Sequence, residues 1–498
     1  MRRRAFVAGL APAIVRGQAS RRPNILVAMA DDLSYPHTSA MGCSVVNTPA
    51  FDRVAEGGVL FRNAFAGAPG CAPSRAALLT GRHIWTLEEA GTHASLFPRK
   101  FAVYPELLGK AGYHVGLTGK GASPCNFKDA GWPHNPAGPS YDAVKETRPL
   151  EGMNPLDYAA NFGRFLDKRP KGAPFCFWFG STEPHRVYKK GIGVASGKRL
   201  DRIVVPPFLP DTLEVRSDLA DYLTEIEHFD LHLGRMLDLL SKTGELDNTI
   251  VVVTADNGMS FPGAKAAMKD YGWHVPMAVM AKGHFRGGRV SEDLVSFTGL
   301  APAFLEAAGV ARPAGQNGRS LLPLLRSSRS GVIDSKFDAV YAGRERHSHS
   351  RRDNLGYPTR AIRTREFLYI RNFKPDRWMA GDPPGFHDID DGPTKQWMMA
   401  HRDDSAVKPL FDAAFGKMPG EELYNVRLDP GCLNNLAGQQ QGVARELSAR
   451  LMGELRRTGD PRVTGKGDVW ESYPRFSPMR PELGGFAERG RYNPAFQK

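Results

Sequence analysis

The chain has 498 residues, of which 41% are hydrophobic and 24% are charged, and its formal net charge is +13. This composition is typical of a folded globular protein long enough for one large and one smaller domain, and the sequence after the N-terminus contains no apolar run long enough for a transmembrane helix. The basic charge suits an anionic partner such as a sulfated or phosphorylated polymer, whereas the sequence lacks the zinc-finger, helix-turn-helix and basic-aromatic patterns of nucleic-acid binding.

The first residues, MRRRAFVAGLAPAIVRGQAS, combine a basic start, a short apolar core and a small-residue exit. This pattern is typical of a bacterial export signal, and the run RRAFV (residues 3–7) resembles the twin-arginine type. We therefore interpret residues 1–22 as an export signal and expect the protein in the bacterial periplasm or outside the cell. A merely basic N-terminus without structure is the alternative.

Several segments share one pattern, an apolar run of strand character that ends in polar residues. They are NILVAMADD (24–32), YHVGLTGK (113–120), PFCFWFGSTEPH (174–185) and TIVVVTADNG (249–258). Such runs, separated by helices such as the one expected over 218–244, are typical of buried strands in a parallel sheet. Ligands bind outside the carboxyl ends of these strands, so we expect the polar residues to meet at one site.

The pattern changes after about residue 330. We interpret RAIRTREFLYIRN (360–372) as one edge-type strand, because its polarity alternates. The segment ELYNVRLDP (422–430) follows, and we expect an amphipathic helix in VARELSARLMGELRR (443–457). The predicted fold is therefore α/β, with a central, mostly parallel sheet flanked by helices over residues 23–332. Residues 333–498 are expected to form a smaller α+β domain with a Pro/Gly-rich tail.

Two pairs of oxygen-bearing residues end predicted strands, Asp31 with Asp32 and Asp256 with Asn257. Adjacent carboxylates at a buried sheet edge repel each other unless a cation lies between them. Oxygen ligands without a nearby Cys/His cluster favour a hard ion, Ca²⁺ or, as second choice, Mg²⁺. Turn and helix-capping roles are the alternative for either pair alone, but two such pairs on strands of one type favour a metal site.

One cysteine, Cys71, precedes a predicted short helix that contains Arg75 one turn later and stops at Gly81. A helix N-terminus attracts anions, and Arg75 can hold a tetrahedral oxyanion on the same face. A thiolate nucleophile and a structural cysteine are both open at this point. The full set of cysteines is odd in number and too widely spaced for a disulfide scaffold: Cys43, Cys71, Cys125, Cys176 and Cys432.

The run CAPSRAALLTGR (71–82) closely resembles the signature of the type I sulfatases. Further blocks similar to that family are RPNILVAMADD, VNTPAFDRVAEGGVLFRNAF, EIEHFDLHLGRMLDLL and NTIVVVTADNG, and the resemblance extends over residues 22–325, with a looser match over 340–440. It implies an alkaline-phosphatase-like fold and hydrolysis of sulfate from a sulfated saccharide. It also implies that a modifying enzyme oxidises Cys71 to formylglycine, an aldehyde whose hydrate is the nucleophile.

The resemblance also implies roles for individual residues. One hydroxyl of the hydrate would attack sulfur and the second would release sulfate, with Ca²⁺ lowering the pKa of the hydroxyl. Arg75 would orient the modified side chain, Lys120 would contact sulfate and nucleophile, and His185 would lie near the leaving group. Lys265 would bind sulfate. The implied Ca²⁺ ligands are Asp31, Asp32, Asp256, Asn257 and the modified Cys71.

One position departs from the family pattern. Most relatives carry a histidine in a Gly-Lys-x-His block, where this chain has Gly119, Lys120, Gly121 and Ala122. A usual acid/base partner is therefore missing. His134 and His274 are the candidates to replace it.

Three blocks look most like the heparan N-sulfatase branch of the family: FLPDTLEVRSDLADYLTEIEHFD, ADNGMSFPGAK and GYPTRAIRTREFLYIRN. This resemblance implies a glucosamine N-sulfate as substrate. The basic run over 344–377 could line the substrate pocket through His347 and His349, or could be a solvated face. The alternatives are an O-sulfatase acting on another glycan, a phosphohydrolase of the same fold and an inactive glycan-binding relative.

Overall fold

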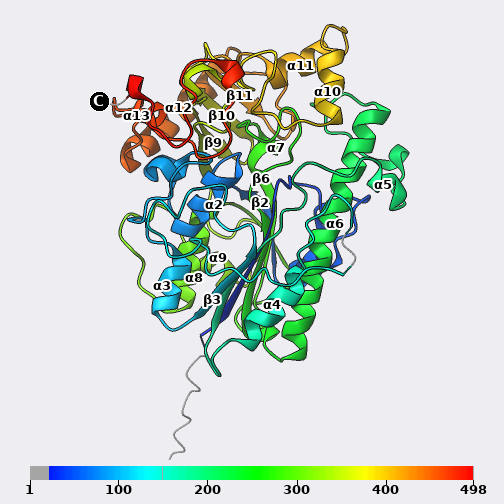
Figure 1. The fold of residues 1–498 in the computed structure, drawn as a ribbon, viewed down its shortest axis with the longest axis vertical. Coiled ribbons are helices and arrows are strands. Elements are labelled where there is room, and N and C mark those ends of the chain that lie inside the picture. Colours follow the sequence, from blue (N-terminus) through cyan, green and yellow to red (C-terminus); the bar gives the residue numbers. More distant parts are fainter. Residues whose placement is uncertain (1–21, 148–149, 497–498) are drawn as a thin grey trace, which may run out of the picture.

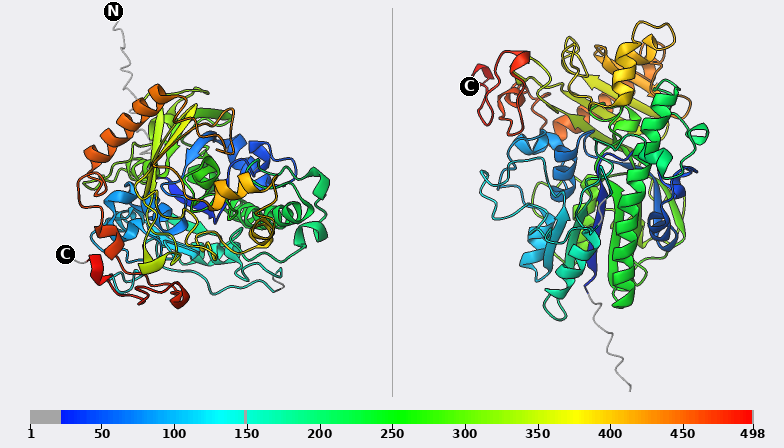
Figure 2. Two further views of the ribbon diagram at one scale, coloured as in Figure 1. Left: turned by 90° about the horizontal axis from the view of Figure 1, so that it is seen from above. Right: turned by 45° about the vertical axis from the view of Figure 1, so that its right-hand side comes forward.

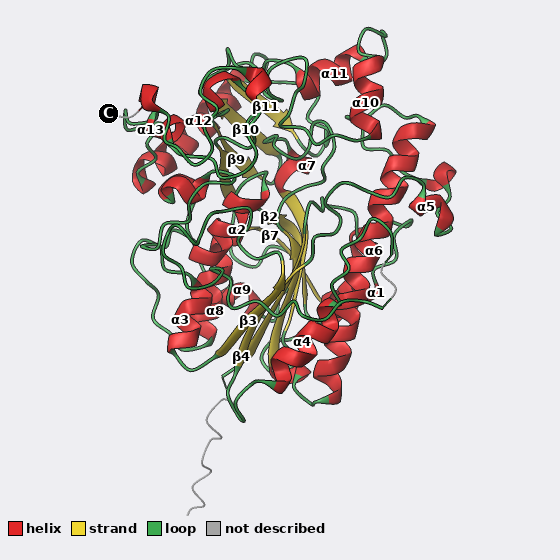
Figure 3. Cartoon of the chain, viewed as in Figure 1, coloured by secondary structure: helices red, strands yellow, loops and turns green. Residues whose placement is uncertain are grey.

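The structure is a computed structural model that describes residues 22–147 and 150–496. Residues 1–21, which hold nearly all of the expected export signal, lie outside the described residues. In the part that is described, no helix combines the length and the apolar character needed to cross a membrane. The strands pack at the centre of the molecule and helices cover both faces of the larger sheet (Figure 3).

The central sheet has seven strands in the order β3-β4-β1-β5-β6-β2-β7. Only β6 runs antiparallel to its neighbours, and all other pairs are parallel. The four strands predicted from apolar runs are confirmed as β1, β3, β4 and β5, which lie side by side in parallel. The bounds are β1 Asn24–Ala30, β2 Val59–Phe65, β3 His114–Gly119, β4 Phe175–Gly180, β5 Thr249–Ala255, β6 His274–Met280 and β7 Arg289–Ser296.

Helices cover the two faces of this sheet (Figures 1 and 2). One layer contains α2 (Cys71–Thr80), α3 (Tyr104–Lys110), α8 (Leu300–Ala307) and α9 (Leu322–Arg326), and the other contains α1 (Pro49–Gly57), α4 (Tyr158–Asp167), α5 (Ile192–Ala195) and α6 (Leu213–Lys242). Every residue of β1, β4 and β5 is buried, as expected for strands with helices on both faces.

The long helix α6 was expected over 218–244 and begins earlier, at Leu213, where the Thr212 hydroxyl accepts a hydrogen bond from the Val215 N–H and caps the helix. Its last residue is Lys242, and Gly244 follows with a φ of +68°. That left-handed conformation suits glycine and ends the helix.

A second sheet, with the order β11-β10-β9-β8, is antiparallel throughout. It lies beyond the carboxyl ends of the central strands, so those ends face the C-terminal part of the chain (Figures 1 and 2). Its strands are β8 Ala339–Arg344, β9 Thr359–Thr364, β10 Phe367–Asn372 and β11 Glu421–Asn425. The remaining helices are α7 Asp270–Trp273, α10 Pro393–Ala400, α11 Lys408–Phe415, α12 Gln441–Thr458 and α13 Val469–Ser472.

The interpretation of RAIRTREFLYIRN as one edge strand was wrong, because this segment forms the hairpin of β9 and β10 in the middle of the second sheet. The Thr364 hydroxyl accepts the Phe367 N–H at 3.1 Å and closes the turn. Two arginines of this segment do not face solvent: Arg360 is buried between Glu345 and Asp460, and Arg363 is buried and paired with Asp270. Charged residues that are buried in ion pairs therefore gave the sequence the alternating polarity that is typical of a half-exposed edge strand.

The expected helix over 443–457 is confirmed as α12, and the segment before it contains β11. Leu447, Leu451 and Leu455 of α12 pack with Ile362 and Tyr369 of the second sheet. Trp85 and Ala77 belong to the same cluster, so α12 fastens the second sheet to the region around α2.

A close contact at the end of β3 provides a test of this packing. Gly119 has a φ of +74°, and a Cβ there would lie 2.2 Å from the Gly180 carbonyl oxygen, whereas Gly112 has a φ of +91° with open space around it. We expect Gly112→Ala to lower the free energy of unfolding by about 1–2 kcal/mol through backbone strain. Gly119→Ala should cost about 1–3 kcal/mol more, because the added methyl overpacks the strand pair. Urea unfolding of both variants measures this difference, and equal losses would contradict the packing described.

Candidate active site

The polar ends of four neighbouring strands meet at one edge of the central sheet, as the sequence predicted. In the register of β1 and β5, Ala30 pairs with Ala255, which places the residues that follow each strand next to each other. The Asp32 N–H donates to Asp256 Oδ1 at 3.0 Å, and Asn257 Nδ2 donates to Asp32 Oδ1 at 2.8 Å. The residues that follow β1 and β5 therefore form one buried cluster, called the acidic cluster below: Asp31, Asp32, Asp256 and Asn257.

Cys71 is the first residue of α2, as expected, and Gly81 ends that helix with a φ of +68°. Burial raises the pKa of the Cys71 thiol to about 11. A thiol with this pKa is protonated at neutral pH, so the structure does not favour a plain thiolate nucleophile. Its Sγ lies within 4.8 Å of carboxylate oxygens of Asp31 and Asp256.

Arg75 connects α2 to the ends of two strands. Its Nε donates to Asp256 Oδ2 at 2.7 Å, and its Nη1 donates to the carbonyls of Lys120 and Gly121 at 2.6 and 3.0 Å. The side chain is fully buried, and a buried guanidinium needs partners of this kind. Arg75 therefore fixes the position of the helix that carries Cys71, and most of its donors are already engaged by the protein.

Two lysines pair with the acidic cluster. Lys120 Nζ donates to Asp31 Oδ2 at 2.5 Å, and Lys265 Nζ donates to Asp32 Oδ2 at 2.7 Å. Burial alone would lower the pKa of each ammonium group, but the neighbouring carboxylates outweigh burial and raise the pKa of both lysines. Both therefore carry a positive charge at the site, which is the charge that an anionic group would meet.

Asp390 was not found by sequence reasoning, although its carboxylate lies 2.9 Å from Lys265 Nζ. It comes from the segment before α10, far along the chain, and follows no apolar strand that would have marked it. Its pKa is well below the ordinary value because Lys265 and His185 outweigh the effect of burial. Asp390 thus brings the C-terminal part of the chain into the acidic cluster.

His185 follows β4 and lies at the mouth of the site. Its Nδ1 donates to the Arg186 carbonyl at 2.7 Å, which leaves Nε2 directed toward Asp32, at 3.9 Å from Oδ2. The side chain is 35% exposed, so a substrate can reach it. It lines a cavity of about 400 Å³ together with Asp31, Lys120 and the loop over 152–155.

The other histidines proposed from the sequence have different surroundings. His347 lies against Gly70, because a Cβ at Gly70 would be 2.9 Å from its Nδ1, and its ring packs on His93 with centroids 4.6 Å apart. Burial lowers the pKa of His347 to about 3, so the ring is neutral. His349 is buried elsewhere, where its Nδ1 accepts the Arg480 N–H.

Neither candidate for the missing acid/base histidine is in contact with the reacting groups. The ring of His274 is held by Asp270 and by the Arg62 carbonyl, each at 2.9 Å, and is buried within the sheet. That prediction was wrong, because the polar neighbours of β6 use both ring nitrogens. His134 donates to the carbonyl of the adjacent Asn135.

The residues present fit a divalent cation. Asp31 Oδ1 and Asn257 Oδ1 are buried and have no hydrogen-bond partner among the residues that the structure describes. Buried oxygens without partners are costly, and a cation between them would satisfy both. Burial also raises the pKa of Asp256 despite Arg75 nearby, so this edge of the sheet can accommodate more positive charge. All of these donors are oxygens, the type that Ca²⁺ and Mg²⁺ prefer.

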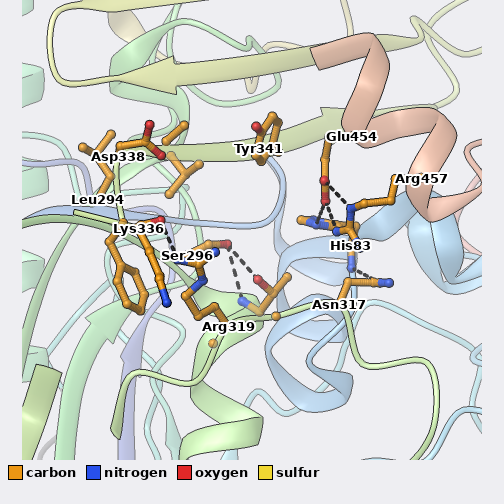
Figure 4. A pocket seen from close by; sticks show the side chains of 16 residues that line it. His83, Leu294, Ser296, Asn317, Arg319, Lys336, Asp338, Tyr341, Glu454 and Arg457 are labelled. Carbon is orange, nitrogen blue, oxygen red and sulfur yellow. Dashed lines mark hydrogen bonds and ion pairs between the residues drawn. The ribbon is translucent and has the colours of Figure 1, made fainter. Parts of the chain in front are cut away.

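A larger cavity of about 510 Å³ lies between β7, β8 and α12 (Figure 4). Its wall contains His83, whose Nε2 lies 3.3 Å from Glu454, and Arg457, which is 2.6 Å from the same carboxylate. No residue of the acidic cluster lines it. The size of a cavity therefore does not identify the active site here, whereas the convergent charges do.

Comparisons with known proteins agree with this geometry. The family model described as sulfatase matches residues 23–310, and the model described as N-sulphoglucosamine sulphohydrolase, C-terminal, matches residues 264–401. The second match supports the expected resemblance to the heparan N-sulfatase branch.

Similar curated proteins include an ulvan-active sulfatase of Formosa agariphila, 28% identical with 90% of this chain and 85% of that protein covered. The human N-sulphoglucosamine sulphohydrolase is 29% identical, with 72% and 75% covered. A solved structure in complex with its substrate D-glucosamine-2-N,6-O-disulfate has a TM-score of 0.65 at 21% identity, covering 89% of this chain and 99% of that one. That likeness supports the alkaline-phosphatase-like fold.

The sulfatase model spans more than half of the chain, including Cys71 and the acidic residues at the strand ends. This protein therefore belongs to the sulfatase family and is a hydrolase that acts on sulfate esters or sulfamates.

Proposed function

We propose that this sulfatase removes the N-linked sulfate of glucosamine in heparin-type saccharides, using a formylglycine derived from Cys71 and a bound Ca²⁺. The observation that carries the proposal is the position of Cys71, at a helix start beside buried carboxylates and between two protonated lysines. The match to the N-sulphoglucosamine sulphohydrolase C-terminal model supports the choice of substrate.

Asp31, Asp32, Asp256 and Asn257 are the residues that would hold the cation. When bound, Ca²⁺ supplies positive charge that lowers the pKa of a neighbouring hydroxyl and offsets the charge of the sulfuryl oxygens. Mg²⁺ is the second choice, because the donor oxygens suit both ions. The two lysines that now pair with Asp31 and Asp32 would then be free to bind sulfate oxygens.

The formylglycine at position 71 would supply a hydroxyl that attacks sulfur and another that allows sulfate to leave. Arg75 keeps the start of α2 in place through its bonds to Asp256 and to the Lys120 carbonyl. Lys120 follows β3 and Lys265 lies in the loop after β5, and both are close enough to influence the charge of residue 71. A sulfate group placed there would therefore meet two positive charges.

Departure of an amine requires a proton, and His185 is positioned to provide it. Its Nδ1 is occupied by the Arg186 carbonyl, so Nε2 is the nitrogen that faces Asp32 and Asp390. Asp390 would hold this imidazole and Lys265 together, which makes the C-terminal part, residues 333–498, necessary for a complete site alongside the larger domain of residues 23–332. His347 would contact the substrate beside Gly70, whereas His349 has no place in this account.

The relatives act on several kinds of sulfated saccharide, including an N-acetylglucosamine-6-O-sulfatase of Bacteroides thetaiotaomicron that is 26% identical. An O-sulfate is therefore the second candidate substrate. We further propose that the protein is exported through the signal at residues 1–22 and meets the modifying enzyme before export, as a twin-arginine signal allows for folded proteins.

The modification of Cys71 can be tested by peptide mass spectrometry. We expect active protein to carry an aldehyde in place of the thiol, and Cys71→Ala to abolish turnover because no other group can take the role of the nucleophile. Cys43→Ala, a change at a half-buried cysteine away from the cluster, is the control and should be active. Fully active protein with an unmodified thiol at Cys71 would exclude the mechanism.

The cation can be tested through Asp256→Ala. This change removes a ligand and the main partner of Arg75, so we expect bound calcium to be lost and turnover to fall by about two orders of magnitude or more. Asp238→Ala is a matched control, since its carboxylate is exposed and pairs with Arg53 at 2.8 Å, away from the strand ends. Calcium content measured by elemental analysis decides the question, and unchanged calcium in folded Asp256→Ala would contradict the assignment.

The substrate can be tested with N-sulfated and 6-O-sulfated glucosamine side by side. We expect preference for the N-sulfate, and loss of about two orders of magnitude in turnover for His185→Ala, the usual scale for a general acid. His134→Ala is the control histidine variant and should behave as the parent. Preference for the O-sulfate would move the protein to another branch of the family, faster turnover of a phosphate ester would indicate a phosphohydrolase, and binding without turnover would indicate an inactive relative.

A further inference from the structure

Two histidines one turn apart on α6 face a glutamate from a different part of the chain. His228 and His232 are separated by four residues, so they share one face of the helix. Their rings lie in edge contact with centroids 4.8 Å apart. Glu146 Oε1 is 3.2 Å from His232 Nε2, and one ligand atom from each of the three residues lies within 4.8 Å of the others.

The nitrogens of these rings have few partners. His228 is 4% exposed, and neither of its nitrogens has a hydrogen-bond partner within residues 22–147 and 150–496. His232 is fully buried, and its Nε2 lies 3.2 Å from Glu146 Oε1 without the geometry of a hydrogen bond. Buried polar atoms of this kind are normally satisfied. One nitrogen of each ring lies within 4.8 Å of the Glu146 carboxylate, and this convergence indicates a group that is bound between them.

The chemistry of the donors suits a metal ion. His232 would bind through Nε2, the nitrogen that faces Glu146. Asp157 Oδ1 lies 3.9 Å from the other ring nitrogen, Nδ1, which is too far for a hydrogen bond. Arg235 donates to Asp157 at 2.7 Å and lies 3.4 Å from the same Nδ1, so its charge is balanced next to the site.

We propose that Glu146, His228 and His232 bind one Zn²⁺ ion, with water in the fourth position. Two imidazoles and a carboxylate are a common Zn²⁺ donor set, whereas Ca²⁺ and Mg²⁺ take oxygen ligands. This site is therefore chemically distinct from the acidic cluster at the strand ends. Closure around the ion requires only small rotations of side chains that already face one another.

The ion would fasten one wall of the active-site cavity to α6. The Glu146 N–H donates to the Pro155 carbonyl at 2.8 Å, and Met153, Asn154 and Pro155 line the cavity that contains His185. Tyr158 packs edge-on against His232, while its hydroxyl donates to Glu183 at 3.1 Å. Zn²⁺ would thus hold Glu146 and, through it, Pro155 in the positions that shape this wall of the cavity.

The test uses full-length protein without a histidine tag, stripped of metal with a chelator and then saturated with Ca²⁺. We expect titration with ZnCl₂ to show one Zn²⁺ per chain with a micromolar or lower Kd, unchanged in Asp256→Ala. His228→Gln and His232→Gln should each weaken Zn²⁺ binding by about 100-fold or more. Loss of a residue that only orients a ligand already weakens metal binding by about 10- to 100-fold, and loss of the ligand itself should weaken it at least as much. His401→Gln, a change at a partly buried helix histidine bonded to the Trp397 carbonyl, should leave binding unchanged.

A second measurement keeps the proposal testable if the glutamine variants fail to fold. The parent protein loaded with Co²⁺ should show the intense visible absorption of four-coordinate cobalt, which one equivalent of Zn²⁺ abolishes. Absence of Zn²⁺ binding in the presence of Ca²⁺, with the weak spectrum of hydrated Co²⁺, would overturn the proposal. Unchanged Zn²⁺ affinity in folded His232→Gln would overturn it equally.

Discussion

The structure depends on the neutralisation of carboxylates buried at the carboxyl edge of the central sheet. Asp31, Asp32 and Asp256 are at most 1% exposed, and each faces a positive side chain. An isolated buried carboxylate is too costly to persist in its charged form. The positions of α2, of the strand ends and of the C-terminal segment all follow from the need to bring cations to this edge.

Arg75 shows how this requirement links fold to function. Its bonds to Asp256 and to the Lys120 carbonyl join α2, β5 and the residue after β3 at a single buried point. The same contacts set Cys71 beside the carboxylates, so one side chain meets a stability requirement and places the residue that we propose as the nucleophile. A bound cation would pair with the carboxylates and a sulfate group would pair with the lysines, in place of the present lysine–carboxylate pairs.

Much of the site could be predicted from the sequence because its residues directly follow buried strands. The apolar runs fixed where β1, β3, β4 and β5 end, and parallel strands bring those ends together. Asp390 could not be found in this way, since it reaches Lys265 from a loop that no local pattern marks. The hairpin of β9 and β10 was missed for a related reason: Arg360 is buried with partners that are distant in sequence.

The account is tested most directly by a crystal structure of Cys71→Ser protein with Ca²⁺ and N-sulfated glucosamine. The account predicts one calcium ion on Asp31, Asp32, Asp256 and Asn257, with the sulfur above residue 71 and sulfate oxygens on Lys120 and Lys265. The sugar should occupy the cavity lined by His185 and Asn154. A saccharide bound elsewhere, for example in the cavity beside His83 and Glu454, with no cation at the strand ends, would contradict it.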